Sequence, residues 1–250
     1  NILSVSDGTN TAAYAYDSAN QLIREDNSLA GKSYQWVYDD AGNIRNRGEY
    51  AYTTGALDTP TDTADYAYDD SSWGDLLTAY DGSTITYDQV GNPLSDGTWT
   101  YTWEHGRQLA SITSADAAWT FTYDAEGMRT GRTNGTTAYS YIYNGGKLTQ
   151  MTVGNDTVTF TYDASGNPQT LTYNGTTYYY AVNLQGDVMA ILDGNGNELI
   201  QYVYRGYGTG HYALIDTTIG ATLFSLNPLL YRGYVYDREI GLYYLQSRYY

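Results

Sequence analysis

The side chains of this sequence that could do chemistry are mainly carboxylates, and their spacing decides which chemistry is open to them. The segment Asp193-Gly-Asn195-Gly-Asn197-Glu198 alternates oxygen-bearing residues, as the start of a calcium-binding loop does. Its sixth position is Glu198, where such a loop needs glycine, and its twelfth is Tyr204, where the loop needs a bidentate glutamate. We therefore interpret the segment as a hairpin turn, with a weak cation site as the alternative.

Histidines and paired carboxylates give little support for catalysis. His105 and His211 are the 2 histidines of the chain, and they stand far apart without the spacing of zinc ligands or of a general-base arrangement. The two carboxylates of a glycosidase must lie roughly 5 to 9.5 Å apart, but the acidic residues here stand mostly in turn-like positions. We predict that the chain is not an enzyme and that it has no catalytic residue, no metal site and no cofactor.

The acidic residues instead follow a repeat of about twenty residues, in which a Tyr-Asp pair precedes a glycine three residues after the aspartate. The clearest pairs of aspartate and glycine are Asp39 with Gly42, Asp88 with Gly91, Asp124 with Gly127, and Asp163 with Gly166. We expect each carboxylate to accept backbone N–H groups two or three residues further on, and each glycine to adopt a positive φ. These residues are predicted to be structural turn formers.

Two copies depart from the repeat. Asn20 stands where the copy at Asp17 should have glycine, and residues 69–74 are two residues too long. We predict loops or bulges at these two places.

The segments between the turns alternate as strands do. Val158, Phe160 and Tyr162 share one face, and threonines occupy the other. From Asn134 onward the turn signals recur about every ten residues, the spacing of short strands joined by tight turns. The pattern predicts an all-β protein of tandem hairpins in a long, curved antiparallel sheet. Helix is expected only over residues 216–226, capped by Thr217 or Thr218.

The composition excludes several classes of partner. The formal net charge of −16 argues against a surface that binds nucleic acid. No run of residues approaches the roughly 18 apolar residues of a membrane span. Tyrosine supplies 31 residues against 3 phenylalanines, so buried rings must carry hydroxyl groups, and there is no cysteine for disulfides.

The tyrosine–aspartate copies resemble the YD repeats of the RHS family of large bacterial surface and secreted proteins. The last residues resemble the RHS-repeat-associated core of that family, and the resemblance covers essentially the whole chain. On this basis the chain divides into repeats over 1–227 and a core segment over 228–250. The matching core residues are Tyr231, Arg232, Gly233, Asp237, Gly241, Leu242, Tyr243, Tyr244, Arg248, Tyr249 and Tyr250.

The resemblance implies a function as well as a fold. In several relatives, hairpins spiral into a shell around a variable C-terminal toxin, so the implied partners are the remaining repeats and the toxin cargo of a secreted or surface-displayed parent protein. A first alternative is an adhesive module that binds cell-surface glycans through exposed aromatic residues.

A further alternative is an aspartic self-cleaving module. Some relatives release their cargo with one aspartate in the core and another in a following Asp-Pro segment. The position three residues before Gly241 is Arg238 in this sequence, with Asp237 one position earlier. The following segment would lie beyond Tyr250.

Overall fold

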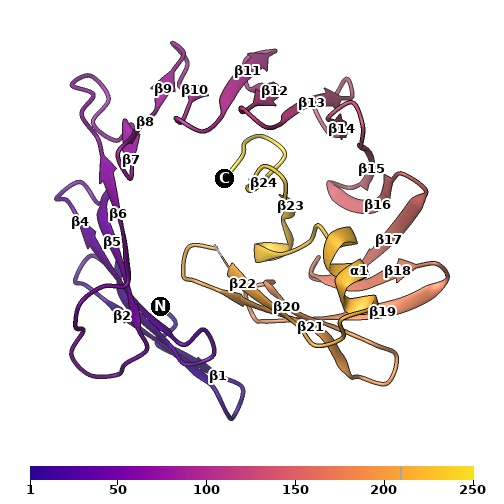
Figure 1. Ribbon diagram of the computed structural model, residues 1–250, viewed down its shortest axis with the longest axis horizontal. Helices are drawn as coiled ribbons and strands as arrows, with labels where there is room; N and C mark the ends of the chain where they lie inside the picture. The colour runs from indigo at the N-terminus through magenta and orange to yellow at the C-terminus, as the bar shows by residue number, and fades with distance from the viewer. Residues whose placement is uncertain (209) are drawn as a thin grey trace. The chain divides into compact units, whose positions relative to one another are not determined.

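A computed structural model (Figure 1) describes residues 1–208 and 210–250, without the side chain of His211. The chain forms two compact units. Residues 1–100 and 205–209 make the first, and residues 101–204 and 210–250 make the second. The division into 1–227 and 228–250 stays a prediction.

The first unit is built on one antiparallel sheet whose strands follow each other in chain order from β1 to β8. These strands are β1 (Ser4–Ser6), β2 (Thr11–Tyr16), β3 (Leu22–Asn27), β4 (Lys32–Tyr38), β5 (Ile44–Ala51), β6 (Asp62–Ala67), β7 (Ala79–Tyr80) and β8 (Ser83–Thr84). The short strands β9 (Thr86–Tyr87) and β10 (Pro93–Ser95) also pair antiparallel.

The second unit continues the pattern, with each strand from β11 to β22 beside its sequence neighbour. Its first strands are β11 (Thr100–Glu104), β12 (Gln108–Thr113), β13 (Ala118–Tyr123), β14 (Arg129–Thr133), β15 (Ala138–Asn144) and β16 (Lys147–Val153). They are followed by β17 (Asp156–Tyr162), β18 (Pro168–Tyr173), β19 (Thr176–Val182), β20 (Val188–Leu192), β21 (Glu198–Tyr204) and β22 (Gly210–Leu214). The remaining elements are α1 (Ile219–Leu226), the 3-10 turn η1 (Tyr231–Gly233), β23 (Val235–Asp237) and β24 (Leu242–Tyr244).

This architecture confirms the predicted fold class of antiparallel hairpins with little helix. Among the described residues, no helix has both the length and the apolar character needed to cross a membrane.

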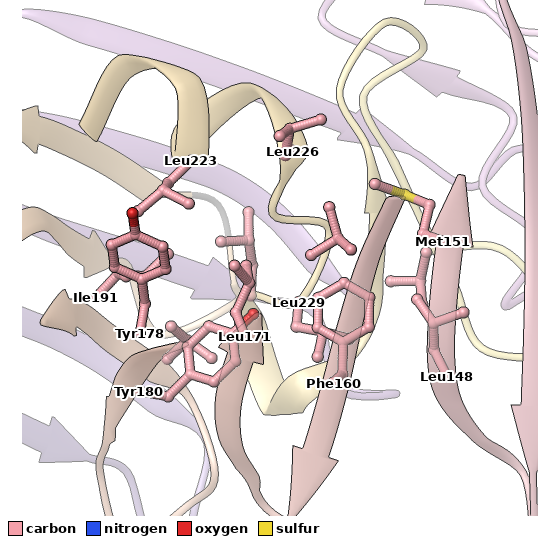
Figure 2. Close-up of a cluster of buried hydrophobic side chains, with 14 of the residues drawn as sticks. Leu148, Met151, Phe160, Leu171, Tyr178, Tyr180, Ile191, Leu223, Leu226 and Leu229 are labelled. Carbon is pink, nitrogen blue, oxygen red and sulfur yellow. The ribbon is translucent and has the colours of Figure 1, made fainter. Parts of the chain in front are cut away.

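Strand alternation places the core of the second unit on one face of its sheet. Val158 and Phe160 are buried while the threonines between them are exposed. Helix α1 and residues 228–250 cover this face (Figures 1 and 2). Each fully buried apolar side chain contributes about 1.5–3 kcal/mol. The core includes Leu148, Met151, Phe160, Leu171, Tyr178, Tyr180, Ile191, Leu223, Leu226 and Leu229.

Helix α1 occupies the predicted place and begins after one of the two predicted capping residues, but a different side chain accepts the capping hydrogen bonds. Thr218 is the N-cap and makes no side-chain capping hydrogen bond. The Asp216 carboxylate instead accepts the N–H groups of Thr218 and Ile219, at 2.7 and 2.8 Å. Aspartate at this position favours the helix start through the same acceptor chemistry and through its negative charge.

A β-bulge follows the repeat turns and was predicted only for the irregular copies. In the copy at Asp39, Val37 pairs with Asn46 and Tyr38 pairs with Ile44, so the register shifts by one residue on the strand after the turn. The copy at Asp163 shows the same shift opposite Thr161 and Tyr162. Each shift leaves one extra residue six positions after the aspartate, Arg45 in the first case. The regular turn therefore includes a bulge, which changes the phase of alternation on the following strand.

The tyrosine of the repeat has a second role, which explains why it is not phenylalanine. Its hydroxyl donates to a backbone carbonyl of the preceding strand. The donor–acceptor pairs are Tyr38 with Leu22, Tyr123 with Leu109, Tyr162 with Leu148, and Tyr204 with Val188, at distances of 2.7 to 3.0 Å. A half-buried ring whose hydroxyl also satisfies a carbonyl fastens each repeat to the repeat before it.

The first unit buries one carboxylate. Glu25 is fully buried and accepts hydrogen bonds from Asn27 Nδ2 and from the Gly206 N–H, at 3.1 and 2.8 Å. Burial raises the pKa of Glu25 above its ordinary value of 4.5, although both hydrogen bonds act in the opposite direction.

The raised pKa of Glu25 predicts a pH dependence of the first unit. An acid whose pKa is higher in the folded state stabilises the fold below its unfolded pKa, and this contribution is lost as pH rises through the folded pKa. We therefore expect the urea midpoint of the wild type to fall as pH rises above about 4.5, and Glu25→Gln to lack that fall. Parallel curves for the two proteins between pH 4 and 8 would contradict this expectation.

Candidate functional site

The structure places the predicted turn residues at the ends of hairpins. In the copies at Asp39, Asp88, Asp124 and Asp163, Oδ1 accepts the N–H groups two and four residues further on, at 2.8 to 3.1 Å. The second acceptor contact is therefore one residue later than expected. The N–H of Asn167 is the main cause that lowers the pKa of Asp163, so the turn holds an ionised carboxylate.

The glycines Gly42, Gly91, Gly127 and Gly166 all have a positive φ, between 83° and 92°. The copy at Asp17 keeps the same turn, because Asn20 adopts a φ of 63° and Asp17 accepts from Ala19 and Gln21. Asparagine tolerates this conformation better than most residues. The Asp17 copy thus has the predicted bulge, where the register shifts between Ala15 and Tyr16, but its turn is as regular as in the other copies.

Replacing Gly166 by alanine should destabilise the second unit by about 1 kcal/mol, because alanine at a φ of +84° is strained. The new Cβ would also lie 3.2 Å from Lys147 Cε. A matched control is Gly194→Ala, since Gly194 has no positive φ and nothing lies within 4 Å of an added Cβ. Equal urea midpoints for the two variants would show that the left-handed conformation does not matter.

The calcium-like segment and the histidines fill structural places. Asp193 accepts the N–H groups of Asn195 and Asn197 and the side-chain amide of Asn197, as in the other repeat turns. His105 lies in a turn with a φ of 46°, and the backbone of His211 lies in β22. Within residues 1–208 and 210–250, no three acidic or histidine side chains converge on a possible metal position.

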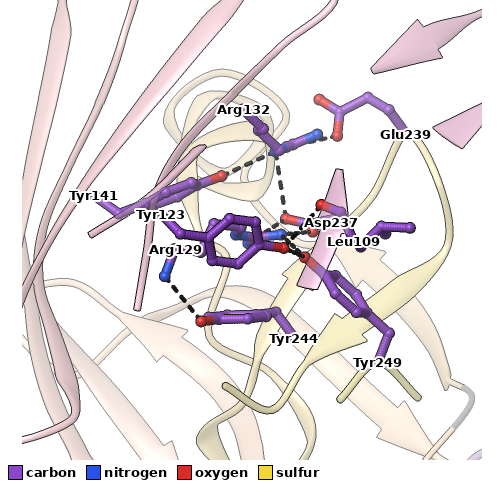
Figure 3. A network of polar contacts seen from close by, with 9 residues as sticks. All are labelled: Leu109, Tyr123, Arg129, Arg132, Tyr141, Asp237, Glu239, Tyr244 and Tyr249. Carbon is purple, nitrogen blue, oxygen red and sulfur yellow. Dashed lines mark hydrogen bonds and ion pairs between the residues drawn. The ribbon is translucent and has the colours of Figure 1, made fainter. Parts of the chain in front are cut away.

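The core motif residues gather in two groups. Asp237, Tyr244 and Tyr249 surround Arg129 (Figure 3), and Tyr231, Tyr243 and Tyr250 pack ring against ring. Gly241 allows the turn between β23 and β24 with a φ of 72°, and its N–H donates to the Asp237 carbonyl. Leu242 opens β24, Arg232 and Gly233 belong to η1, and Arg248 is exposed in the closing turn.

Three buried charged residues of the second unit, Arg129, Arg132 and Asp237, form a group with the exposed Glu239, and we name these four residues the ion-pair cluster. Arg129 donates through Nη1 and Nη2 to the two oxygens of Asp237, the second at 3.0 Å. Arg132 Nε lies 3.3 Å from Asp237 Oδ1, and Arg132 Nη2 lies 2.8 Å from Glu239 Oε2. Arg129 and Asp237 are 0% and 1% exposed.

Aromatic rings enclose both guanidinium groups. Arg129 lies 4.3 Å from the Tyr244 ring centroid and 4.9 Å from that of Tyr141. Arg132 lies 3.9 Å from the Tyr139 ring and 4.6 Å from the Trp119 ring. Arg129 Nε and Arg132 Nη1 have no hydrogen-bond partner among the described residues, and the nearby rings stabilise the buried charge.

The electrostatics keep the cluster charged. Burial alone would lower the pKa of Arg129, but the Asp237 carboxylate outweighs burial and holds that pKa above its ordinary value. Burial would raise the pKa of Glu239, but Arg132 and the Tyr139 hydroxyl lower it below the usual range. Burial raises the pKa of the neighbouring Tyr141 hydroxyl to about 12, so this ring stays neutral.

The repeat bulge brings the two arginines to the same face. Residues three apart on a regular strand point to opposite faces. Tyr123 pairs with Arg129 and Phe121 pairs with Arg132, so the bulge leaves Thr130 as the extra residue and both arginines face the core. Arg129 and Arg132 were not predicted as site residues. The feature of the sequence that could have indicated them is a pair of cations close together in one strand of an acidic chain.

The cluster can fasten the core segment to the sheet, and its geometry fits that role better than catalysis. Both oxygens of Asp237 are taken by guanidinium groups, and Glu239 is taken by Arg132 and by the Tyr139 hydroxyl at 2.6 Å. An aspartic protease needs two carboxylates that share a proton. Here the two carboxylates are paired with arginines instead, and Asp237 and its partner Arg129 are 108 residues apart in the sequence.

Comparisons with known proteins agree with this fold. No protein-family model matches the chain. The tRNA3(Ser)-specific nuclease WapA of Bacillus spizizenii is 32% identical over 242 residues, which cover 94% of this chain and 10% of that protein. The tRNA nuclease WapA of Bacillus subtilis is 31% identical over the same length, with the same coverage. The chain thus spans about a tenth of the length of these curated relatives.

A solved structure shows the same fold. The crystal structure of TcdB2-TccC3-Cdc42 matches 97% of this chain and 15% of that chain, with a TM-score of 0.61 and 16% identity. The tandem hairpins and the fastened C-terminal segment define a tyrosine-rich β scaffold made of repeats. The likeness to WapA and to the TccC3 fold identifies its relatives, and the chain belongs to the YD-repeat, or RHS-repeat, family.

Proposed function

We propose that this chain is a non-catalytic segment of a repeat shell that encloses and delivers a C-terminal toxin within a larger bacterial protein. That protein would be secreted or displayed at the cell surface. The observation that carries the proposal is the match to WapA. The aligned region is only a tenth of that nuclease, but it covers 94% of this chain, which consists of hairpins. The partners would be the remaining repeats and the toxin domain.

The ion-pair cluster supports this proposal by its position. It joins the core segment, which contributes Asp237 and Glu239, to strand β14, which contributes Arg129 and Arg132. In a shell, a segment that leads toward the cargo needs a fixed place against the wall. A buried, ring-covered ion pair supplies one, because separating it would leave charges unpaired inside the protein.

The alternatives make different use of the same residues. An adhesive module would use exposed aromatic residues. Self-cleavage would need the carboxylate of Asp237 free for a second aspartate, whereas two arginines engage it. We therefore keep the enclosing scaffold as the proposed function.

The test uses the full-length parent protein with an epitope at its C-terminus. Limited proteolysis should leave the tagged domain protected in the wild type, and Asp237→Ala should make it sensitive. Arg248→Ala, an exposed residue of the same segment, is the matched control and should leave protection unchanged. Equal protease sensitivity of wild type and Asp237→Ala, or a tagged domain that is open in both, would contradict the proposal.

A further inference from the structure

A pocket of about 250 Å³ lies in the second unit, and Tyr244, whose ring also covers Arg129 of the ion-pair cluster, forms part of its lining. Strands of the sheet contribute Tyr143, Lys147 and Tyr162 to its lining, and the core segment contributes Arg232, Tyr244 and Gln246. The volume lies just below the range of roughly 300–1,000 Å³ for small-molecule sites. It therefore suits one ring with its substituents and not a longer ligand.

The backbone around this pocket is strained at two places. Among the described residues, the non-glycine positions with positive φ are Asn20, Asp81, His105, Asn174, Arg232 and Gln246. The first four are of types that adopt this conformation most readily. Arg232, at 56°, and Gln246, at 66°, are not, and both line the pocket. Such strain concentrates at ligand sites, because the surrounding structure must hold it in place.

Specific contacts hold both strained residues. The N–H of Arg232 donates to Oδ1 of the buried Asp187 at 2.9 Å, and the Arg232 guanidinium lies 3.6 Å from the same oxygen. Gln246 Nε2 donates to the Gly146 carbonyl at 2.6 Å. The structure thus maintains Arg232 and Gln246 in conformations that glycine would adopt without cost.

The charge of the pocket is opposite to that of the chain. Its charged lining residues are Lys147 and Arg232, and no carboxylate lies among the described residues that line it, although the chain has a net charge of −16. Lys147 Nζ lies 5.4 Å from the Tyr162 ring centroid and donates to the Gly166 carbonyl. An ammonium group has three donors and a guanidinium five, so both cations retain donors for a ligand.

We propose that this pocket binds the carboxylate-bearing ring of an acidic sugar, with Lys147 and Arg232 pairing the carboxylate and tyrosine rings packing against the sugar. Charge-assisted hydrogen bonds from these cations favour carboxylate over a neutral hydroxymethyl group. Tyrosine offers a flat apolar face and a hydroxyl, the combination that suits a sugar ring. This inference does not rest on the proposed enclosure of a toxin.

A sugar fits the lining better than a peptide segment does. Peptides that bind as extended strands pair with a free strand edge through backbone hydrogen bonds. The core segment next to the pocket already uses its backbone, because Tyr244 pairs with Tyr249 and Leu229 pairs with Val235. Side chains therefore provide the recognition.

The experiment titrates the 250-residue chain with sodium D-glucuronate by calorimetry and by ligand-observed NMR, with D-glucose as the neutral control. Glucuronate should bind saturably at one site, at least about tenfold more tightly than glucose. A uronate trisaccharide tests whether the pocket recognises the free sugar or a sugar unit within a polysaccharide. If the trisaccharide binds more tightly than the monosaccharide, the ligand is a polysaccharide. If the two bind equally well, the ligand is the free sugar.

Arg232→Gly is the decisive variant, because glycine relieves the left-handed strain while removing the guanidinium. It should weaken glucuronate binding at least about tenfold. The relieved strain offsets the lost contact between the guanidinium and Asp187, so the thermal midpoint should stay close to that of the wild type. His105→Gly relieves the same kind of strain outside the pocket and should bind like the wild type. The proposal would be overturned if glucuronate did not bind saturably, if glucose bound as tightly as glucuronate, or if Arg232→Gly bound glucuronate as the wild type does. It would also be overturned if acetyl-Glu-Tyr-amide displaced glucuronate at a lower concentration than glucuronate itself needs to bind.

Discussion

Asp237→Ala is expected to destabilise the second unit by about 3–5 kcal/mol, the largest effect of any single substitution in the ion-pair cluster. The variant leaves the fully buried Arg129 without a carboxylate, and Arg132 keeps only Glu239. An unpaired guanidinium in a site lined by rings cannot recover the hydration it lost on folding. Urea unfolding followed by the fluorescence of the buried Trp119, which lies against Arg132, measures the loss.

Two comparisons separate the charge effect from a general packing defect. Glu239→Ala removes a carboxylate whose side chain is 36% exposed and should cost about 1 kcal/mol or less. The double variant Arg129→Met with Asp237→Leu should be more stable than Asp237→Ala, because neither partner is left charged and alone. A loss of less than about 1 kcal/mol for Asp237→Ala would mean that water reaches Arg129 and that the cluster does not fasten the core segment.

Most of the fold could be predicted from local sequence, because turns and strands are decided by neighbouring residues. An aspartate with a glycine three residues later is enough to reverse the chain, and alternation of rings with threonines is enough to orient a strand. The place of α1 followed from an apolar stretch before Pro228. Thr218 was one of the two predicted capping residues, but the capping role of the Asp216 side chain did not follow, because Asp216, Thr217 and Thr218 all stand near the helix start and only the backbone path selects among them.

The ion-pair cluster could not be predicted in the same way. Strict alternation puts Arg129 and Arg132 on opposite faces, and only the bulge at Thr130 brings them together. Their partner Asp237 lies 108 residues from Arg129, in a segment with no sequence relation to β14. The family resemblance named Asp237, but no local rule assigns it an arginine partner.

The triple variant Tyr123→Phe, Tyr162→Phe and Tyr204→Phe is expected to lose about 3 kcal/mol of stability in the second unit. Each hydroxyl donates to a carbonyl of an earlier strand, and a typical hydrogen bond of this kind contributes about 1 kcal/mol. The three sites lie on different strands without shared partners, so their effects should add. Phenylalanine keeps the ring, so the change reports the hydroxyl alone.

Exposed tyrosines provide the matched control, since Tyr179 and Tyr212 are 46% and 52% exposed. Their double replacement by phenylalanine should change stability by less than about 0.5 kcal/mol.

Alkaline pH gives an independent check, because burial raises the pKa of Tyr123 to about 12 from its ordinary value of 10.0. A raised folded pKa means stability that is present below pH 10 and lost as pH rises toward 12, so the wild type should lose more than the triple variant over that range. If the triple variant matches the control in urea and loses stability in parallel with the wild type above pH 10, the repeat tyrosines act only as apolar rings. The abundance of tyrosine over phenylalanine would then have no basis in fastening one repeat to the next.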